Sequence, residues 1–221
     1  MKTLQKFGGL SALYMAMSHF VGLIIFIVIL DYISITDLAQ KVAVNVNNQV
    51  VVFSTNLLMY VFFGFFLIIF SLALYDRLKA GAPALMQVAT VIGIIWAGSL
   101  MASGMAANAG LTTVVSLYGK DPSQAALIFD VIDAIATKGL GYGSGDILGG
   151  LMTVLISLAA LKAGELPKAL NILGLVVGIM GIFSLIPMLT NMLAPVFGLG
   201  QIIWFIWMGI VLLRSNPVKT I

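Results

Sequence analysis

"VVVFSTNLLMYVFFGFFLIIFSLAL", residues 50–74, is an apolar run without a single charged side chain. About 20 such residues cross the hydrocarbon core of a bilayer as one helix. In lipid, only helices and closed barrels satisfy all of their backbone hydrogen bonds, and this run lacks the apolar–polar alternation of a barrel strand. It therefore predicts a transmembrane helix.

Five further apolar segments have the same character: 8–30, 84–110, 141–161, 169–186 and 196–213. Pro83, Pro167 and Pro195 each stand just before one of them, where the missing N–H of proline costs nothing, so we expect them to mark helix starts. The predicted fold class is all-α: a polytopic integral membrane bundle of six transmembrane helices, formed by residues 1–221 as a single domain.

The composition excludes several classes of protein. The chain is 61% hydrophobic and only 9% charged, whereas a soluble domain has about a quarter of its residues charged. Cysteine is absent and there is one histidine, which excludes disulfides, thiolate metal sites and a two-histidine zinc helix. We predict no catalytic residues, no cofactor and no nucleic-acid partner. Membrane lipid is the expected surrounding.

The distribution of lysine and arginine predicts the orientation. Under the six-span scheme, eight of the 11 basic residues fall on the side of the two termini, and three fall on the opposite side: Lys41, Lys120 and Lys138. Basic loops face the cytoplasm, so we expect both termini to be cytoplasmic in a multi-pass protein of the bacterial inner membrane. Most of the acidic residues then face outward.

A long outer loop follows the third span. Within it, "PSQAALIFDVIDAIATK", residues 122–138, begins with a helix-start signal and carries Asp130 and Asp133 on one stripe. The apolar part is too short to span a bilayer, so it predicts an extra interfacial or partly re-entrant helix between spans three and four. A run of alternating glycines, residues 139–145, then leads into the fourth span.

These acidic residues allow two interpretations. Asp130 and Asp133 repel each other unless a cation or a lysine lies between them, and with Asp146 and Asn108 they would offer oxygen ligands suited to a hard metal cation. Alternatively, the stripe is solvated, and Asp146 or Ser144 is the N-cap of the fourth span.

His19 lies near the middle of the first predicted span, and ionisable groups inside membranes are candidates for function. The six-span scheme places no acid at its depth. A neutral imidazole bonded to a hydroxyl of Ser18, Ser99 or Ser103 is the structural interpretation, and haem binding with a methionine as the second axial ligand is the cofactor alternative. His19 and Asn108 are thus the predicted ligand-binding residues.

Small residues predict where helices touch. Gly98, Ala102, Ala106 and Gly110 recur every four residues, and Gly174 with Gly178 repeats this spacing in the fifth span. Such stripes allow close approach of two backbones, either within one chain or between the subunits of a homo-oligomer.

The last third of the chain carries a family resemblance. Residues 164–181, "GELPKALNILGLVVGIMG", and 197–214, "FGLGQIIWFIWMGIVLLR", resemble a bacterial family of six-helix membrane proteins catalogued as a domain of unknown function (DUF4386-like). The resemblance rests on Leu166, Pro167, Leu170 and Gly174, and on the Trp-Phe-Ile-Trp run. It implies six spans and an inner-membrane location, and it supplies no catalytic residues.

Two functions fit these observations. The first is a non-enzymatic accessory protein that binds lipid or a partner membrane protein. The second is a small-cation or proton-coupled carrier or channel that uses the outer carboxylates and His19. We favour the first, because transporters carry polar residues in several spans near the midplane, whereas here only His19 qualifies. An intramembrane enzyme is a third class, without catalytic groups to support it.

Overall fold

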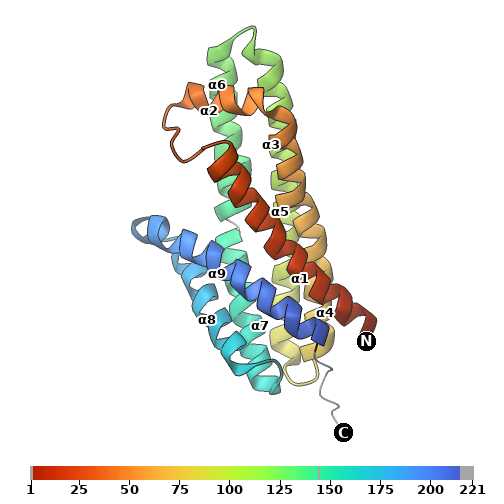
Figure 1. Ribbon diagram of the computed structural model, residues 1–221. Coiled ribbons are helices and arrows are strands. Elements are labelled where there is room, and N and C mark those ends of the chain that lie inside the picture. The colour runs from red at the N-terminus through yellow and green to blue at the C-terminus, as the bar shows by residue number, and fades with distance from the viewer. Residues whose placement is uncertain (1, 144, 215–221) are drawn as a thin grey trace.

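Helices and the short turns between them make up the residues that the computed structural model describes, 2–143 and 145–214, with no strand in these ranges, as the sequence predicts (Figure 1). Its α-helices are α1 Lys2–Leu23, α2 Leu38–Asn47, α3 Gln49–Asn56, α4 Phe63–Leu78, α5 Pro83–Tyr118, α6 Pro122–Ile132, α7 Gly150–Ala163, α8 Lys168–Phe183 and α9 Pro187–Arg214. Wider π-helical turns continue them: η1 Ile24–Ile29, η2 Leu57–Phe62, η3 Asp133–Gly143 and η4 Gly145–Gly149.

Five helical runs within the described residues are long and apolar enough to cross a membrane: Thr3–Ile29, Gln49–Leu78, Pro83–Tyr118, Pro122–Ala163 and Pro187–Arg214. The sixth apolar helix, α8, has 16 residues and a length of about 24 Å, which is short of the hydrocarbon thickness of about 30 Å. Within the described residues the predicted spans lie on helices, except that 184–186, the end of the fifth, form the turn after α8, and five helical runs have the length of a membrane span.

The outer segment differs from the prediction. It is longer than predicted, because α6 continues into η3 as far as Gly143 and packs lengthwise along α5, and η4 and α7 follow from Gly145; a separate interfacial helix is not confirmed. The hydroxyl of Ser103 donates to the carbonyl of Ala136 at 2.8 Å, and that of Ser99 donates to the carbonyl of Leu140 at 2.9 Å. These α5 hydroxyls provide hydrogen bonds to carbonyls of the π-helical stretch η3, which allows this irregular helix to pack against α5 inside the bundle.

The last helix also begins earlier than predicted. Pro195 lies inside α9, which starts at Pro187, so the prediction that Pro195 marks a helix start is wrong. Proline at the first helical position needs no hydrogen-bond partner, and Pro187 takes that role. Pro83 and Pro122 begin α5 and α6 in the same way, and Asp121 caps α6 by accepting from the N–H of Gln124.

The small-residue stripes have different outcomes. In the stripe on α5, Gly98, Ala102 and Ala106 are exposed and make no close helix contact within this chain, whereas Gly110 is buried against Ile132 of α6. Contact of the exposed part with another subunit stays a prediction. Gly174 and Gly178 do lie in a tight contact, between α8 and its neighbours α7 and α9. That contact is intrachain, as the sequence analysis allows.

Two parts of the bundle position the site. The column consists of α3–α4, α5 and α6–η3, and the lobe consists of α7, α8 and α9, with α1 packed against α4 and α9 (Figure 1). Their shared core is aromatic: Phe63, Phe70, Trp204 and Phe205 are almost fully buried and meet edge to face, with ring centroids 5.3–6.0 Å apart.

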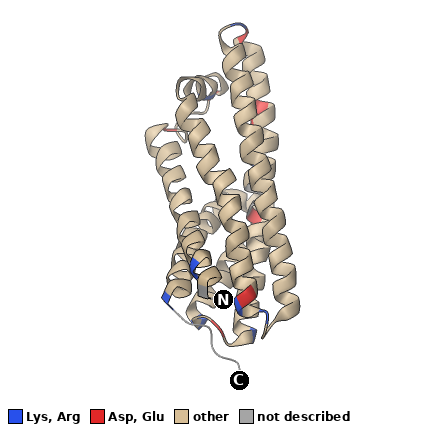
Figure 2. Cartoon of the chain, turned by 90° about the vertical axis from the view of Figure 1, so that its right-hand side faces the viewer, with Lys and Arg blue, Asp and Glu red and all other residues tan. Residues whose placement is uncertain are grey.

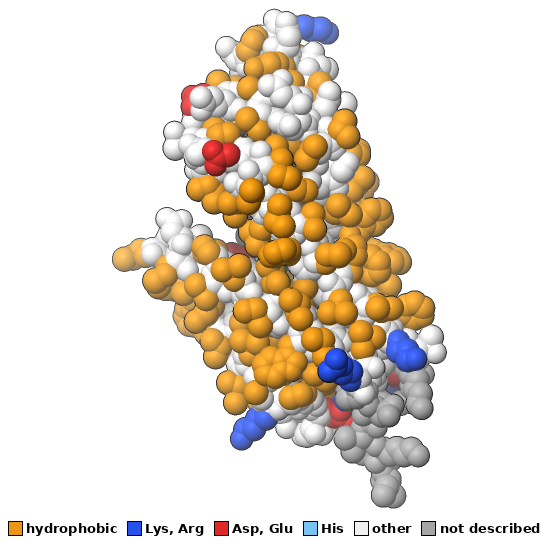
Figure 3. All heavy atoms as spheres, in the orientation of Figure 1, with side chains coloured by type: hydrophobic (Ala, Val, Ile, Leu, Met, Phe, Trp, Pro, Cys, Tyr) orange, Lys and Arg blue, Asp and Glu red, His pale blue; other side chains and the backbone are white. Residues whose placement is uncertain are grey.

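The start of α1 and the end of α9 lie together at one end of the molecule, where the side-chain amide of Gln5 donates to the carbonyl of Leu212 at 2.9 Å. Most basic residues gather at this end, whereas acidic residues also lie far along the column (Figure 2). Apolar side chains cover most of the face between the two ends (Figure 3).

Candidate functional site

Asp146 is the acidic residue with the most unusual position. It is half-buried in η4, and its carboxylate accepts a hydrogen bond of 3.0 Å from the hydroxyl of Ser184, the residue that ends α8. The interpretation of Asp146 as an N-cap is wrong, because Gly149, which precedes α7, already has helical φ and ψ of −65° and −42°. Asp146 lies inside η4, and Ser144, the other predicted cap, lies outside the described residues.

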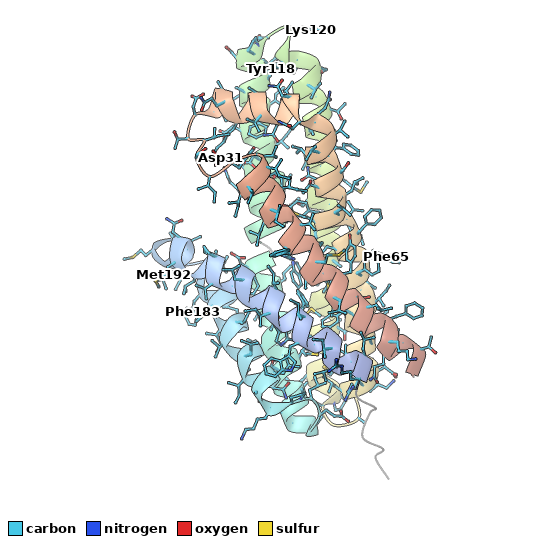
Figure 4. All side chains as sticks on the ribbon, in the orientation of Figure 1. Asp31, Phe65, Tyr118, Lys120, Phe183 and Met192 are labelled. Carbon is cyan, nitrogen blue, oxygen red and sulfur yellow. The ribbon has the colours of Figure 1, made fainter. Side chains whose placement is uncertain are left out.

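An apolar tip surrounds the Asp146–Ser184 pair. The turn between α8 and α9 exposes large apolar side chains, and Met188 is 92% exposed. Phe183 and Met192 point away from the other helices at this tip (Figure 4). The surface is hollowed into a notch where the tip separates from the column (Figure 3). The turn is electrically neutral, since no charged residue occurs between Lys168 and Arg214.

A row of aromatic rings connects His19 to the neighbourhood of Asp146, and the expectation that no acid shares the depth of His19 stays a prediction. The His19 ring meets Phe63 edge to face at 4.9 Å, and Phe63 meets Trp96 at 5.7 Å. The Trp96 ring packs on Gly149, less than one turn from Asp146. The two ionisable groups are therefore separated by two aromatic rings and do not form a direct pair.

The ring nitrogen Nδ1 of His19 lies 3.2 Å from the carbonyl oxygen of Met15, one turn earlier on the same helix. The predicted hydroxyl partners bond elsewhere: Ser18 also donates to Met15, and Ser99 and Ser103 donate to η3. A neutral imidazole with Nδ1–H as the donor is satisfied by this contact.

The predicted cation ligands do not come together. Asp133 pairs with Lys138 at 2.9 Å, so a lysine offsets the repulsion between Asp133 and its exposed neighbour Asp130. Asp146 lies farther along the chain, in η4, where it bonds to Ser184. Asn108 is buried between α5 and α3, where its oxygen accepts from Asn56 at 2.9 Å and its amide donates to the carbonyl of Phe53.

Among residues 2–143 and 145–214, no three or more histidine, cysteine or acidic side chains cluster as a metal site would require. The Asp130, Asp133 and Asp146 site therefore remains a prediction without a preformed pocket.

Sequence reasoning missed an ion pair at the end that holds the termini. Arg77 of α4 donates to the carboxylate of Glu165, between α7 and α8, from Nε at 3.1 Å and from Nη2 at 2.9 Å. Their side chains are 4% and 10% exposed. Each residue looks like an ordinary loop charge in the sequence, and only the packing of α4 against α7 brings them together.

Together, the apolar helices and the isolated polar groups among them fit an integral membrane protein. No family model matches the chain, and no curated protein and no solved structure matches it either. The resemblance to the six-helix family therefore stays a prediction.

Proposed function

We propose that this chain is a non-enzymatic membrane protein that binds a lipid in the notch between the lobe tip and the column. The observation that carries the proposal is the half-buried carboxylate of Asp146 beside the exposed apolar tip. Apolar walls suit acyl chains, and a carboxylate next to them suits a headgroup with an ammonium group, such as that of phosphatidylethanolamine. A charge-assisted hydrogen bond would then offset the cost of the half-buried charge.

The depth of the notch supports a lipid as the ligand. Ala163 ends α7 at the end of the molecule where the basic residues gather. Asp146 lies about 25 Å away from Ala163 along the helix. The hydrocarbon core is about 30 Å thick, so this distance corresponds to the headgroup boundary of the opposite leaflet. With six spans and cytoplasmic termini, as we propose for a bacterial inner membrane, that leaflet is the outer one.

Mass spectrometry of the purified protein tests this function. Wild type is expected to retain phosphatidylethanolamine, and Asp146→Asn to retain less by about tenfold or more, because the charged acceptor is lost. Asp130→Asn is the matched control, since Asp130 is an exposed acid on the same helical run. Equal lipid in Asp146→Asn and wild type, or none in wild type, would refute the proposal.

A second candidate function is a proton-coupled carrier that uses Asp146 and His19. It is supported by the row of rings between the two groups, in which Phe63 meets both His19 and Trp96 and the Trp96 ring packs on Gly149, less than one turn from Asp146. Proton flux into proteoliposomes that disappears in Asp146→Asn would support the carrier, whereas lipid retention without flux supports the accessory protein. Homo-oligomerisation and a partner membrane protein remain compatible with both.

Cysteine labelling tests the proposed orientation, since the chain has no cysteine of its own. Gly119→Cys is expected to react with an impermeant thiol reagent in intact cells, and Lys79→Cys and Lys168→Cys are expected to react only after lysis. All three positions are exposed, so burial does not affect the comparison. The reverse pattern would show that the termini face outward.

A further inference from the structure

Buried polar atoms without a hydrogen-bond partner gather inside the lobe. Among the described residues, five buried side-chain atoms lack a partner, and four of them lie on the facing sides of α7, α8 and α9: Ser157 Oγ, Asn171 Oδ1, Gln201 Oε1 and Trp204 Nε1. Each of these four residues is 1–2% exposed. Native interiors leave few such groups unpaired, and ordered water is the usual partner where protein atoms are not.

Three of the four residues, Ser157, Trp204 and Asn171, lie close to Gly174 of α8. A β-carbon on Gly174 would overlap with Ser157 Oγ and would lie 2.6 Å from Trp204 Nε1. Both polar atoms therefore reach the same small region, which an alanine would fill. One turn earlier on α8, Asn171 presents its unpaired oxygen.

The unpaired atoms of this cluster include both donors and acceptors, but none of them bonds directly to another. The amide N–H groups of Gln201 and Asn171 already donate, to Thr153 Oγ1 at 2.8 Å and to the carbonyl of Glu165 at 3.2 Å. Turning either amide over would only leave its NH2 group unpaired instead. The two amide oxygens thus need donors and the indole N–H of Trp204 needs an acceptor, and water, which supplies two O–H donors and also accepts, fits between them.

We propose that α7, α8 and α9 enclose an internal hydration site, in which water binds to Ser157, Gln201, Trp204 and Asn171. Polar groups continue from this site in both directions. Toward the notch, Thr153 donates to the carbonyl of Gly149, less than one turn from Asp146. Toward the other end, Asn171 leads to Glu165 and its ion pair with Arg77. The hydration site therefore forms the middle of a polar path between the two carboxylates, and it does not depend on the lipid proposal.

Exchange of the indole N–H protons in D2O tests this site. The chain has three tryptophans, so an NMR spectrum of the 15N-labelled protein contains three indole signals, which Trp→Phe variants assign. The Trp204 indole is expected to exchange at least tenfold faster than that of Trp96. Trp96 is the matched control, because its Nε1 is also buried and unpaired. Its ring contacts Phe63 and Gly149 and not the residues of the proposed hydration site.

Ser157→Ala removes one water-binding group with the smallest change in shape. It is expected to slow the exchange of Trp204 and to leave that of Trp96 unchanged. Exchange of Trp204 that is as slow as that of Trp96 in wild type would overturn the proposal, even if no variant folds. The same conclusion follows if Ser157→Ala leaves the exchange of Trp204 unaltered.

Discussion

Replacement of Glu165 by glutamine is expected to lower the free energy of unfolding by about 3–5 kcal/mol, the range for the removal of one partner from a buried ion pair. Glutamine keeps the size of the side chain but leaves the Arg77 guanidinium buried without its negative partner. The loss is large because a buried charge cannot regain its hydration while the fold persists. Unfolding of the detergent-solubilised protein, followed by circular dichroism against temperature or SDS, measures it.

Two variants control for the charge of Glu165. Asp76→Asn removes an acid of the exposed pair with Lys79, 2.6 Å apart at the same end of the molecule, and is expected to change stability little. The double variant Arg77→Leu/Glu165→Leu is expected to be more stable than Glu165→Gln, because it leaves no unpaired charge. A loss in Asp76→Asn equal to that in Glu165→Gln would show that net charge at this end, and not the buried pair, determines stability.

The helices could be predicted because each depends on local sequence. Long apolar runs without charge, such as 50–74, are sufficient to define a helix in lipid, and each such run is helical in the structure. Helix ends were predicted less well. Pro195 was expected to begin a helix but is accommodated inside α9, and residues 122–138 join a longer helical run because serines of α5 bind their carbonyls.

The site was harder to predict because its partners are far apart in the sequence. Asp146 bonds to Ser184 across 38 residues, Gln201 to Thr153 across 48, and Arg77 to Glu165 across 88. The depth of Asp146 also depends on the continuation of η4 into α7, which the glycine run obscured. A usable signal was present, because Thr153 and Ser157 are spaced by one helical turn in an otherwise apolar helix.

Glycine spacing shows the same limit. The four-residue repeat at Gly98 and the one at Gly178 look equivalent in the sequence, yet the first faces outward and the second is in backbone contact with α7. Spacing identifies a face of a helix, but only the neighbouring helices decide whether that face is covered. The two glycines therefore provide a matched pair for a test of packing.

Gly178→Ala is expected to destabilise the protein by about 1–3 kcal/mol, as overpacking of a close contact does. The new β-carbon would lie 2.6 Å from the carbonyl oxygen of Gly150 and 3.0 Å from the backbone nitrogen of Val154. These are backbone atoms that cannot rotate away, so α7 and α8 must move apart. The better helix propensity of alanine offsets the loss by no more than about 1 kcal/mol.

Gly98→Ala is the control in the same measurement. Nothing lies within 4 Å of a β-carbon at Gly98, so this variant is expected to gain the helix propensity of alanine without a clash. The two substitutions are chemically identical, and their opposite effects would isolate the contact between α7 and α8. If Gly178→Ala proved as stable as Gly98→Ala, the close approach of Gly150 and Gly178 would not contribute to the stability of the lobe.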